Sequence, residues 1–269
     1  MFSPPLRLRI AALSAEAREH LGTYLRAVGA EVDDSGEALE ASFEEPPAYL
    51  EDRVEAWLNL VHRAGGETLS TSTGGGPWLD GWRAFYAGAD VAQFRIRPPW
   101  APPPGDGLPV LIDPRGGFGS GLHPTTQLAL RAMAEVGRPG GSMLDVGSGS
   151  GILSVAGSRL GMRVTALEIE AAAREATLRT LRLNGVEARL DSRPLTELTE
   201  RFDLVVANLP EVVLRRSMPA LLAARAEAGA LVLGGFEVED QAAVLASAGL
   251  PIALRLVSDD GRWACVALR

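Results

Sequence analysis

The stretch Asp145-Val-Gly-Ser-Gly-Ser-Gly151 decides the fold of this chain. It overlaps an apolar run, Ser142–Val146, that is typical of a buried strand, and it precedes ILSVAGSRL, which is typical of a helix. Glycines at this turn let backbone N–H groups approach a ligand closely at the carboxyl end of the strand. The stretch therefore predicts a strand, a ligand-binding turn and a helix.

The spacing of these glycines narrows the class of ligand. The dinucleotide fingerprint G-x-G-x-x-G/A does not fit, because counting from Gly147 places Ile152 at the third position and counting from Gly149 places Ser154 there. A P-loop needs a lysine, and the sequence contains none. The remaining pattern is a G-x-G-x-G turn preceded by Asp145, which suits a cationic, adenosine-bearing ligand better than a pyrophosphate.

Strands and helices alternate on both sides of this turn. The strand segments are near-continuous apolar runs, which indicate a parallel sheet covered on both faces. We expect strands at SMLDV, VTALEIE, FDLVVANL, ALVLGGF, PIALRLV and WACVALR, and LPVLI ahead of them is an apolar run. The short link at 259–262 joins the last two, so the sheet should end in an antiparallel hairpin. Residues 108–269 are thus predicted to form a doubly wound, Rossmann-like α/β domain.

The first 75 residues have the pattern of a separate small α+β unit. Two apolar helical repeats alternate with four short strand segments, in the order strand-helix-strand-strand-helix-strand of the ferredoxin-like fold. TGGGP at 73–77 marks the predicted boundary. Residues 76–107 are interpreted as a linker with a short helix, a strand and a proline-rich connector. The aromatic stripe of that helix, which we interpret as packing, is Trp78, Trp82, Phe85 and Tyr86.

Composition excludes several classes of protein. The chain has 269 residues, 46% of them hydrophobic and 22% charged, so it can bury a sizeable core. Neither an apolar run long enough for a membrane span nor an apolar signal core is present in the sequence. The single cysteine, Cys265, excludes an intramolecular disulfide and a cysteine-cluster metal site. We expect a cytoplasmic protein with no bound metal and no membrane contact.

The distribution of charge bears on the partner. The net charge of −8 counts against extended binding to nucleic acid, which depends on clustered basic residues. Residues 1–75 contain six arginines against thirteen Asp plus Glu, so they carry −7 of this charge. An acidic unit of this kind is consistent with a lysine-rich protein partner, and a solvated acidic surface is the ordinary alternative.

Two polar residues at the ends of predicted strands are candidates for the site, and His123 is not. Glu168 ends the second strand, where an acid in such folds accepts both ribose hydroxyls. Asn208 ends the fourth strand at the edge where ligands lie, and a turn residue ahead of Pro210 is an equally good interpretation. His123 is interpreted as a cap or a loop-packing residue rather than a metal ligand or an acid-base group.

Several motifs together carry a family resemblance. DVGSGSGILSVA, with ALEIE downstream, resembles the S-adenosylmethionine-binding core of class I methyltransferases. GGFGSGLHPTT before this core, VVANL after it and the segment WLDGWRAFY…FRIRPPW resemble the PrmA-type methyltransferases of large-subunit ribosomal protein 11. The resemblance covers residues 78–269 by motif and 1–75 only by expected architecture.

The resemblance implies a fold, a cofactor and a set of contacts. It implies a class I methyltransferase domain preceded by a ferredoxin-like domain that recognises the substrate. It implies S-adenosylmethionine as the cofactor, with contacts from Thr126, Gly147, Glu168 and Asn208, and the glycine turn adds Gly149. Asn208 is the predicted catalytic residue, orienting a lysine or N-terminal amine of the ribosomal protein for methyl transfer.

Other functions remain open from the sequence alone. A diverged relative would methylate another protein or a small amine, and a cofactor-binding adaptor would use residues 1–75 for docking without catalysis. Methyltransferases that modify nucleic-acid bases often carry Asn-Pro-Pro-aromatic where this chain has Asn208-Leu-Pro-Glu. That departure and the acidic charge disfavour a nucleic-acid substrate.

Overall fold

The chain divides into two compact units, Met1–Ala87 and Gly88–Arg269. The computed structural model describes residues 6–11, 18–19, 22, 26, 31–36, 38–43, 67–73, 76–77, 88–102, 105–113, 121 and 123–269. The division between Ala87 and Gly88 falls within the segment 76–107, which the sequence predicts to be a linker. The aromatic stripe at 78–86 and most of the GGFGSGLHPTT loop lie outside the described residues, as do most residues of the two helices expected within 1–75.

The first unit contains a five-stranded sheet in which every neighbouring pair is antiparallel. Its strands are β1 (Leu6–Ala11), β2 (Glu31–Asp33), β3 (Leu39–Phe43), β4 (Glu67–Thr73) and β5 (Gly76–Pro77). The order is β2-β3-β1-β4-β5, so β3 lies between β1 and β2 as in a split β-α-β arrangement. The four expected strands are confirmed, while the ferredoxin-like fold as a whole stays a prediction.

A three-stranded sheet follows at the start of the second unit. It consists of β6 (Ala89–Val91), β7 (Phe94–Arg97) and β8 (Leu108–Leu111). The apolar run LPVLI supplies β8, which pairs in parallel with β7 and is not part of the main sheet. Asn184 holds β8 in this position: its Oδ1 accepts from the Leu111 N–H at 2.7 Å, and its Nδ2 donates to the Leu111 carbonyl at 2.6 Å.

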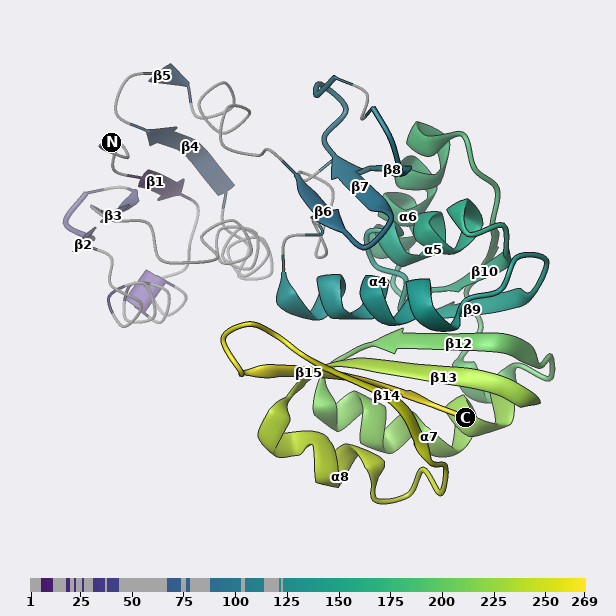
Figure 1. The fold of residues 1–269 in the computed structure, drawn as a ribbon. Coiled ribbons are helices and arrows are strands. Elements are labelled where there is room, and N and C mark those ends of the chain that lie inside the picture. The colour runs from purple at the N-terminus through teal and green to yellow at the C-terminus, as the bar shows by residue number, and fades with distance from the viewer. Residues whose placement is uncertain are drawn as a thin grey trace. The chain divides into compact units, whose positions relative to one another are not determined.

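The main sheet of the second unit has seven strands in the order β11-β10-β9-β12-β13-β15-β14 (Figure 1). They are β9 (Ser142–Val146), β10 (Arg163–Leu167), β11 (Arg189–Asp191), β12 (Phe202–Asn208), β13 (Arg225–Glu237), β14 (Ile252–Val257) and β15 (Trp263–Leu268). The first five are parallel, and β15 is antiparallel to both β13 and β14. The predicted doubly wound sheet with a C-terminal antiparallel hairpin is confirmed.

Helices cover both faces of this sheet (Figure 1). On one face lie α4 (Pro124–Val136), α5 (Ile152–Arg159) and α6 (Ala171–Asn184), and on the other α7 (Glu211–Ala224) and α8 (Gln241–Leu245). Short 3-10 turns occur at η1 (Leu195–Glu197) and η2 (Val238–Asp240). Within the described ranges, no helix has the length and apolarity to cross a bilayer.

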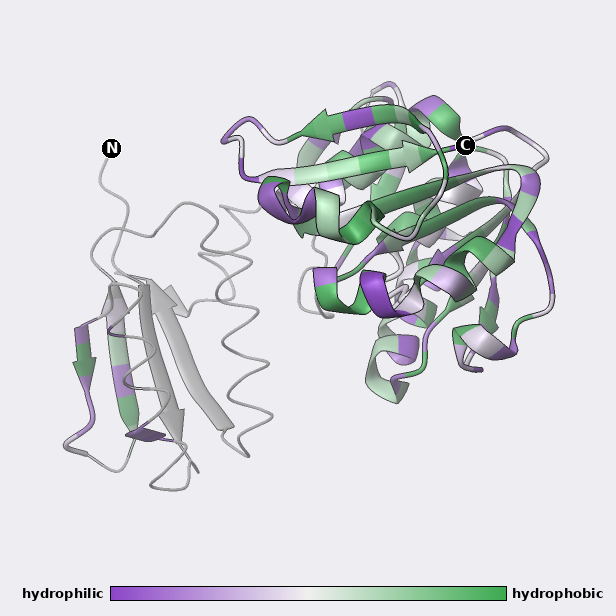
Figure 2. Ribbon diagram, turned by 90° about the horizontal axis from the view of Figure 1, so that it is seen from below, coloured by the Kyte–Doolittle hydropathy of each residue, from purple (hydrophilic) through white to green (hydrophobic). Residues whose placement is uncertain are grey.

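The core lies between the strands and the helices on each face. Figure 2 shows hydrophobic residues concentrated along the strands of the main sheet. On α7, Leu214, Met218 and Leu221 lie on one helical face, and all three are fully buried in the core beside the main sheet. Gly185 ends α6 in the left-handed conformation, at a φ of 59°, as the sequence predicts.

Candidate active site

The candidate site lies where the strand order of the main sheet reverses. From β9 the chain continues to β10 and β11 on one side, and then returns to place β12 on the other side. In doubly wound sheets, ligands bind outside the carboxyl ends of the strands at this switch point. The glycine turn follows β9, Glu168 follows β10, and Asn208 ends β12. The topology therefore brings these predicted site residues to one edge, on three adjacent strands.

The glycine turn is shaped by three glycines with positive φ. The φ angles are 71° at Gly147, 53° at Gly149 and 83° at Gly151, a region that side-chain-bearing residues rarely adopt. The N–H of Gly147 donates to the carbonyl of Leu167 at 2.8 Å, which ties the turn to the end of β10. A Cβ at Gly147 would lie 2.6 Å from Cδ2 of Leu209. A side chain at this position would therefore press on the residue that follows Asn208.

Helix α6 supports the turn from behind through Thr177. The Thr177 hydroxyl donates to the carbonyl of Gly149 and also bonds to the Ser148 hydroxyl, both at 2.9 Å. A Cβ at Gly151 would lie 3.0 Å from Cα of Thr177, so glycine allows the turn and the helix to touch. Sequence analysis missed Thr177, because helical periodicity marks it only as one more inward-facing position.

Glu168 is buried beside the turn, with 8% of its surface exposed. Its Oε2 accepts from the N–H of Gly149 at 3.1 Å, and its Oε1 accepts from the N–H of Glu170 at 3.0 Å. A carboxylate oxygen can accept two hydrogen bonds, so each oxygen keeps one acceptor position. The two N–H bonds fix the orientation of the carboxylate and leave it able to accept a pair of hydroxyl groups.

Asp145 is a second carboxyl group at this edge. It is 1% exposed, and the Ser154 hydroxyl donates to its Oδ2 at 2.6 Å. The pKa of Asp145 is raised to about 6: burial is the main cause, the hydrogen bond from Ser154 opposes it, and the nearby charge of Glu168 adds to the rise. A cationic ligand at this edge would favour the ionised form. The sequence showed an acid ahead of the turn, but we did not include it among the site residues.

Asn208 carries an unpaired acceptor at the end of β12. Among the described residues, its buried Oδ1 has no hydrogen-bond partner, and an unpaired buried acceptor is costly unless a ligand satisfies it. The segment after it is held by the Leu209 N–H, which donates to the Gly234 carbonyl at 3.1 Å. The ordinary alternative, a turn residue ahead of Pro210, does not account for this free oxygen.

The glycine pair at 234–235 allows the close approach of β12 and β13 at this point. A Cβ at Gly234 would lie 3.1 Å from Asn208 Oδ1, and one at Gly235 would lie 2.4 Å from the Leu209 carbonyl oxygen. Gly235 also has a φ of 90°. The doublet in ALVLGGF was visible in the sequence, but only the sheet register, which pairs Asn208 with Gly234, shows its purpose.

The remaining candidate, Thr126, lies in the first turn of α4 and is 1% exposed. His123 is the N-cap of this helix, as expected for a cap residue: its side chain accepts from the Thr125 N–H. A Cβ at Gly121 would lie 2.8 Å from Cδ1 of Ile152, the residue that follows the glycine turn. Gly121 therefore lies against the residue that follows the glycine turn.

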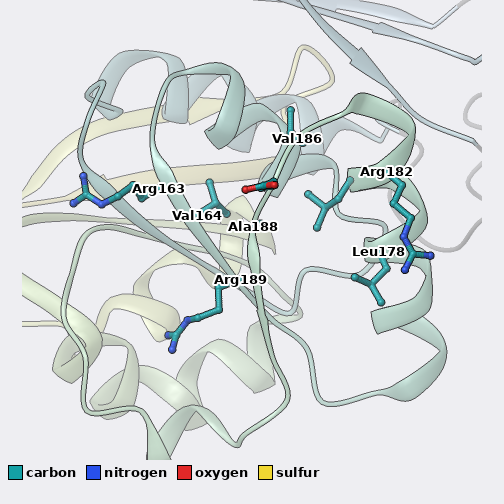
Figure 3. Close-up of a pocket in the computed structure, with 9 residues that line it drawn as sticks. Arg163, Val164, Leu178, Arg182, Val186, Ala188 and Arg189 are labelled. Atoms are coloured by element: carbon teal, nitrogen blue, oxygen red, sulfur yellow. The ribbon is translucent and has the colours of Figure 1, made fainter.

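An open pocket of about 530 Å³ lies elsewhere, between β10, α6 and the segment before β11 (Figure 3). Arg163 and Val164, which begin β10, line it, so it lies toward the amino end of that strand, away from Glu168. In Figure 3 the side chains of Arg163, Arg182 and Arg189 diverge around a largely apolar centre. This arrangement does not converge on a ligand, and the switch point remains the candidate site.

The residues at the switch point fit S-adenosylmethionine on three grounds. The glycines of the turn carry no side chains, so a ligand can approach its backbone closely; Glu168 can accept two hydroxyl groups; and Asn208 Oδ1 needs a donor. Asp145 adds an acidic group, which suits a positively charged ligand.

Comparison with known proteins identifies the family. The family model for "Ribosomal protein L11 methyltransferase (PrmA)" matches residues 48–269. The chain belongs to this family. Its members are methyltransferases, and S-adenosylmethionine is their cofactor.

Individual relatives agree with this assignment. The L11 methyltransferase of Geobacter sulfurreducens is 40% identical over 198 residues, which cover 71% of this chain and 66% of the relative. That of Heliobacterium modesticaldum is 31% identical, covering 86% of this chain and 76% of the relative. A crystal structure of the ribosomal protein L11 methylase from Lactobacillus delbrueckii subsp. bulgaricus has a TM-score of 0.60 and 29% identity, covering 66% of this chain and 95% of that one.

The class I methyltransferase fold is thereby shown for the second unit. The match spans slightly less than two thirds of the length of the two Geobacter relatives, 66% and 64%.

Proposed function

We propose that this chain methylates ribosomal protein L11 on lysine or N-terminal α-amino nitrogens, using S-adenosylmethionine. The observation that carries the proposal is the unpaired Oδ1 of Asn208, one strand away from the glycine turn, in a chain that belongs to the L11 methyltransferase family. An acceptor oxygen at this place is what an attacking amine requires, since the amine has N–H groups to donate.

Cofactor binding would use the turn and Glu168. The free acceptor positions of Glu168 would hold the ribose hydroxyls, the backbone of the glycine turn would lie against the ligand, and Thr126 would contact it from α4. When bound, S-adenosylmethionine supplies an electrophilic methyl group on a positively charged sulfur. Asp145 would stabilise that positive charge electrostatically.

The task of the remaining residues is to aim the amine. Asn208 Oδ1 and the Leu209 carbonyl would each accept one N–H of the incoming amine and point its lone pair at the methyl group. The new N–C bond forms as the C–S bond breaks, and the positive charge moves to the nitrogen. Alignment of this kind is the main source of rate acceleration in such an in-line transfer.

The amine must be neutral to attack. Removal from water disfavours the ammonium form and lowers the pKa of a lysine, so the proton leaves to solvent as the side chain enters the site. A dedicated general base is not needed for this step, and we assign none.

Recognition of the protein substrate would fall to the first unit. Residues 1–75 carry most of the negative charge of the chain, and a lysine-rich ribosomal protein is complementary to it. This role also implies that the enzyme works in the cytoplasm, where ribosomal proteins are made.

Methyl transfer can be measured directly. Purified chain, tritiated S-adenosylmethionine and purified ribosomal protein L11 should give a labelled protein, and label should be lost with the Asn208→Ala variant. Binding of the cofactor by calorimetry, without transfer to L11 or to any other ribosomal protein, would overturn the proposal and favour a non-catalytic adaptor.

A further inference from the structure

The turn between β14 and β15 reaches the start of α4. The ring of Trp263 packs edge-on against the ring of His123, with the ring centroids 5.0 Å apart. The guanidinium of Arg262 also lies over the Trp263 ring, 5.0 Å from its centroid. Arg262 is held in turn by Glu237 on β13, through bonds of 2.6 and 2.9 Å to Oε1.

This contact lies at the same edge of the sheet as the candidate site. Trp263 begins the antiparallel strand β15 and pairs with Glu237 at the carboxyl end of β13. The neighbouring strand β12 ends at Asn208, which pairs with Gly234 on β13. The Trp263 side chain therefore stands beside the site, in contact with the residue that starts the helix carrying Thr126.

His123 caps the first turn of α4 through its Nδ1 atom. Its Nδ1 accepts from the Thr125 N–H at 3.3 Å and lies 2.7 Å from the Thr125 hydroxyl oxygen. The N–H bond requires Nδ1 to be unprotonated. Thr125 and Thr126 are both fully buried, so their positions depend on how this turn begins.

We propose that the His123–Trp263 pair is a positioning device that sets cofactor affinity by fixing the first turn of α4. The inference rests on the proposed function, because it takes Thr126 as a cofactor contact. Neither ring touches the reacting atoms. Trp263 buries His123 and orients it, and His123 caps the turn that presents Thr126.

We expect cofactor affinity to depend on the pH, because the hydrogen bond from the Thr125 N–H needs an unprotonated Nδ1 on His123. Burial lowers the pKa of His123, the positive charge of Arg262 lowers it further, and Asp260 acts in the opposite direction. The neutral ring thus predominates at pH 7.5. Protonation of Nδ1 in mild acid removes the acceptor for the Thr125 N–H, so cofactor affinity should weaken as the pH falls.

The decisive variant is His123→Asn, because asparagine is a good N-cap that does not titrate. S-adenosylmethionine binding to the full-length protein is measured by calorimetry between pH 7.5 and 5.5. At pH 7.5 the variant should bind within about twofold of wild type, and its affinity relative to wild type should rise as the pH falls and His123 of the wild type becomes protonated. Asp145 titrates in the same range in both proteins, so only the difference between them is interpreted. A ratio that is constant with pH would overturn the inference.

The role of Trp263 is tested by two variants, a conservative one and one that removes the ring. Trp263→Phe keeps an edge contact and should bind the cofactor almost as wild type does. Trp263→Ala exposes His123, so the acid-induced loss of affinity should move to higher pH. An Ala variant that remains folded, as judged by its thermal transition, with an unchanged pH profile would contradict the role of Trp263. Failure of wild type to bind the cofactor at all would contradict the proposed function instead.

Discussion

At the scale of single residues, substitutions of Asn208 and Glu168 are expected to change different kinetic parameters. Asn208→Ala removes the acceptor that aims the amine, so kcat should fall by about 10²-fold while the cofactor Kd changes little. Glu168→Ala should weaken cofactor affinity and leave the saturated rate comparatively intact, because ribose binding is the same in ground and transition states. Initial rates against cofactor concentration separate the two. An Asn208→Ala variant with a raised cofactor KM at unchanged kcat would refute the aiming role.

Asp145 gives a second prediction at this scale, on stability. Its pKa is raised from 3.8 to about 6, so the folded protein holds the proton more tightly than the unfolded chain does. The contribution of Asp145 to the free energy of unfolding must therefore fall as the pH rises from about 4 to about 6. Asp145→Asn removes this loss, so its stability relative to wild type should rise across that range, by at most about 3 kcal/mol.

Urea denaturation at several pH values shows whether the stability of Asp145→Asn relative to wild type rises with pH. Asp203 provides the control. The Ser142 N–H and hydroxyl donate to Asp203, and these bonds lower the pKa of its carboxyl group. Asp203→Asn should therefore show the opposite trend, with a stability deficit that is present near neutral pH and shrinks in acid. Parallel trends in the two variants would show that the Asp145 carboxyl is not the group responsible.

At the scale of elements, the packing of β12 against the end of β13 depends on Gly235. A Cβ there would lie 2.4 Å from the Leu209 carbonyl oxygen, so Gly235→Ala should displace the Asn208–Leu209 segment and reduce kcat at least about tenfold. Gly140→Ala is a matched control, because Gly140 also has a positive φ, 79°, but open space around its Cβ position. Equal losses of activity in both variants would indicate backbone strain rather than displacement of the segment.

The connection between β8 and α6 is a second prediction at the element scale. Asn184 satisfies both backbone polar groups of Leu111, so Asn184→Ala leaves a part-buried donor and acceptor without their partner. We expect a loss of about 2–3 kcal/mol in the free energy of unfolding, measured in urea. Arg182→Ala, an exposed change on the same helix, should cost less than about 0.5 kcal/mol. A loss at Asn184 no larger than that would show that the β8–α6 bonds are not stabilising.

At the scale of the whole molecule, the two units should divide the work. The second unit, residues 88–269, contains the complete sheet and every described residue of the candidate site. A fragment with these residues should bind S-adenosylmethionine with an affinity close to that of the full chain, because its core does not depend on the first unit. It should methylate L11 far more slowly. Methylation at the full-length rate would show that residues 1–87 are not needed for recognition.

Sequence alone determined the architecture of the main sheet of the second unit, because the signals for its strands and turns are local. Apolar runs mark the strands, the positive-φ glycines mark the turn after β9, and Gly185 marks the end of α6. Each depends only on a residue and its neighbours in the chain. The same local logic placed Glu168 and Asn208 at strand ends, where parallel strands bring their carboxyl ends to one edge.

Tertiary structure alone decided which distant residues meet. Asn184 bonds the backbone of Leu111 in β8 from more than seventy positions along the chain, and the antiparallel return of β15 brings Trp263 to His123. Local patterns carry no information on such contacts, because burial and hydrogen bonding between remote segments exist only once the sheet has formed. The free oxygen of Asn208 and the raised pKa of Asp145 are consequences of that assembly.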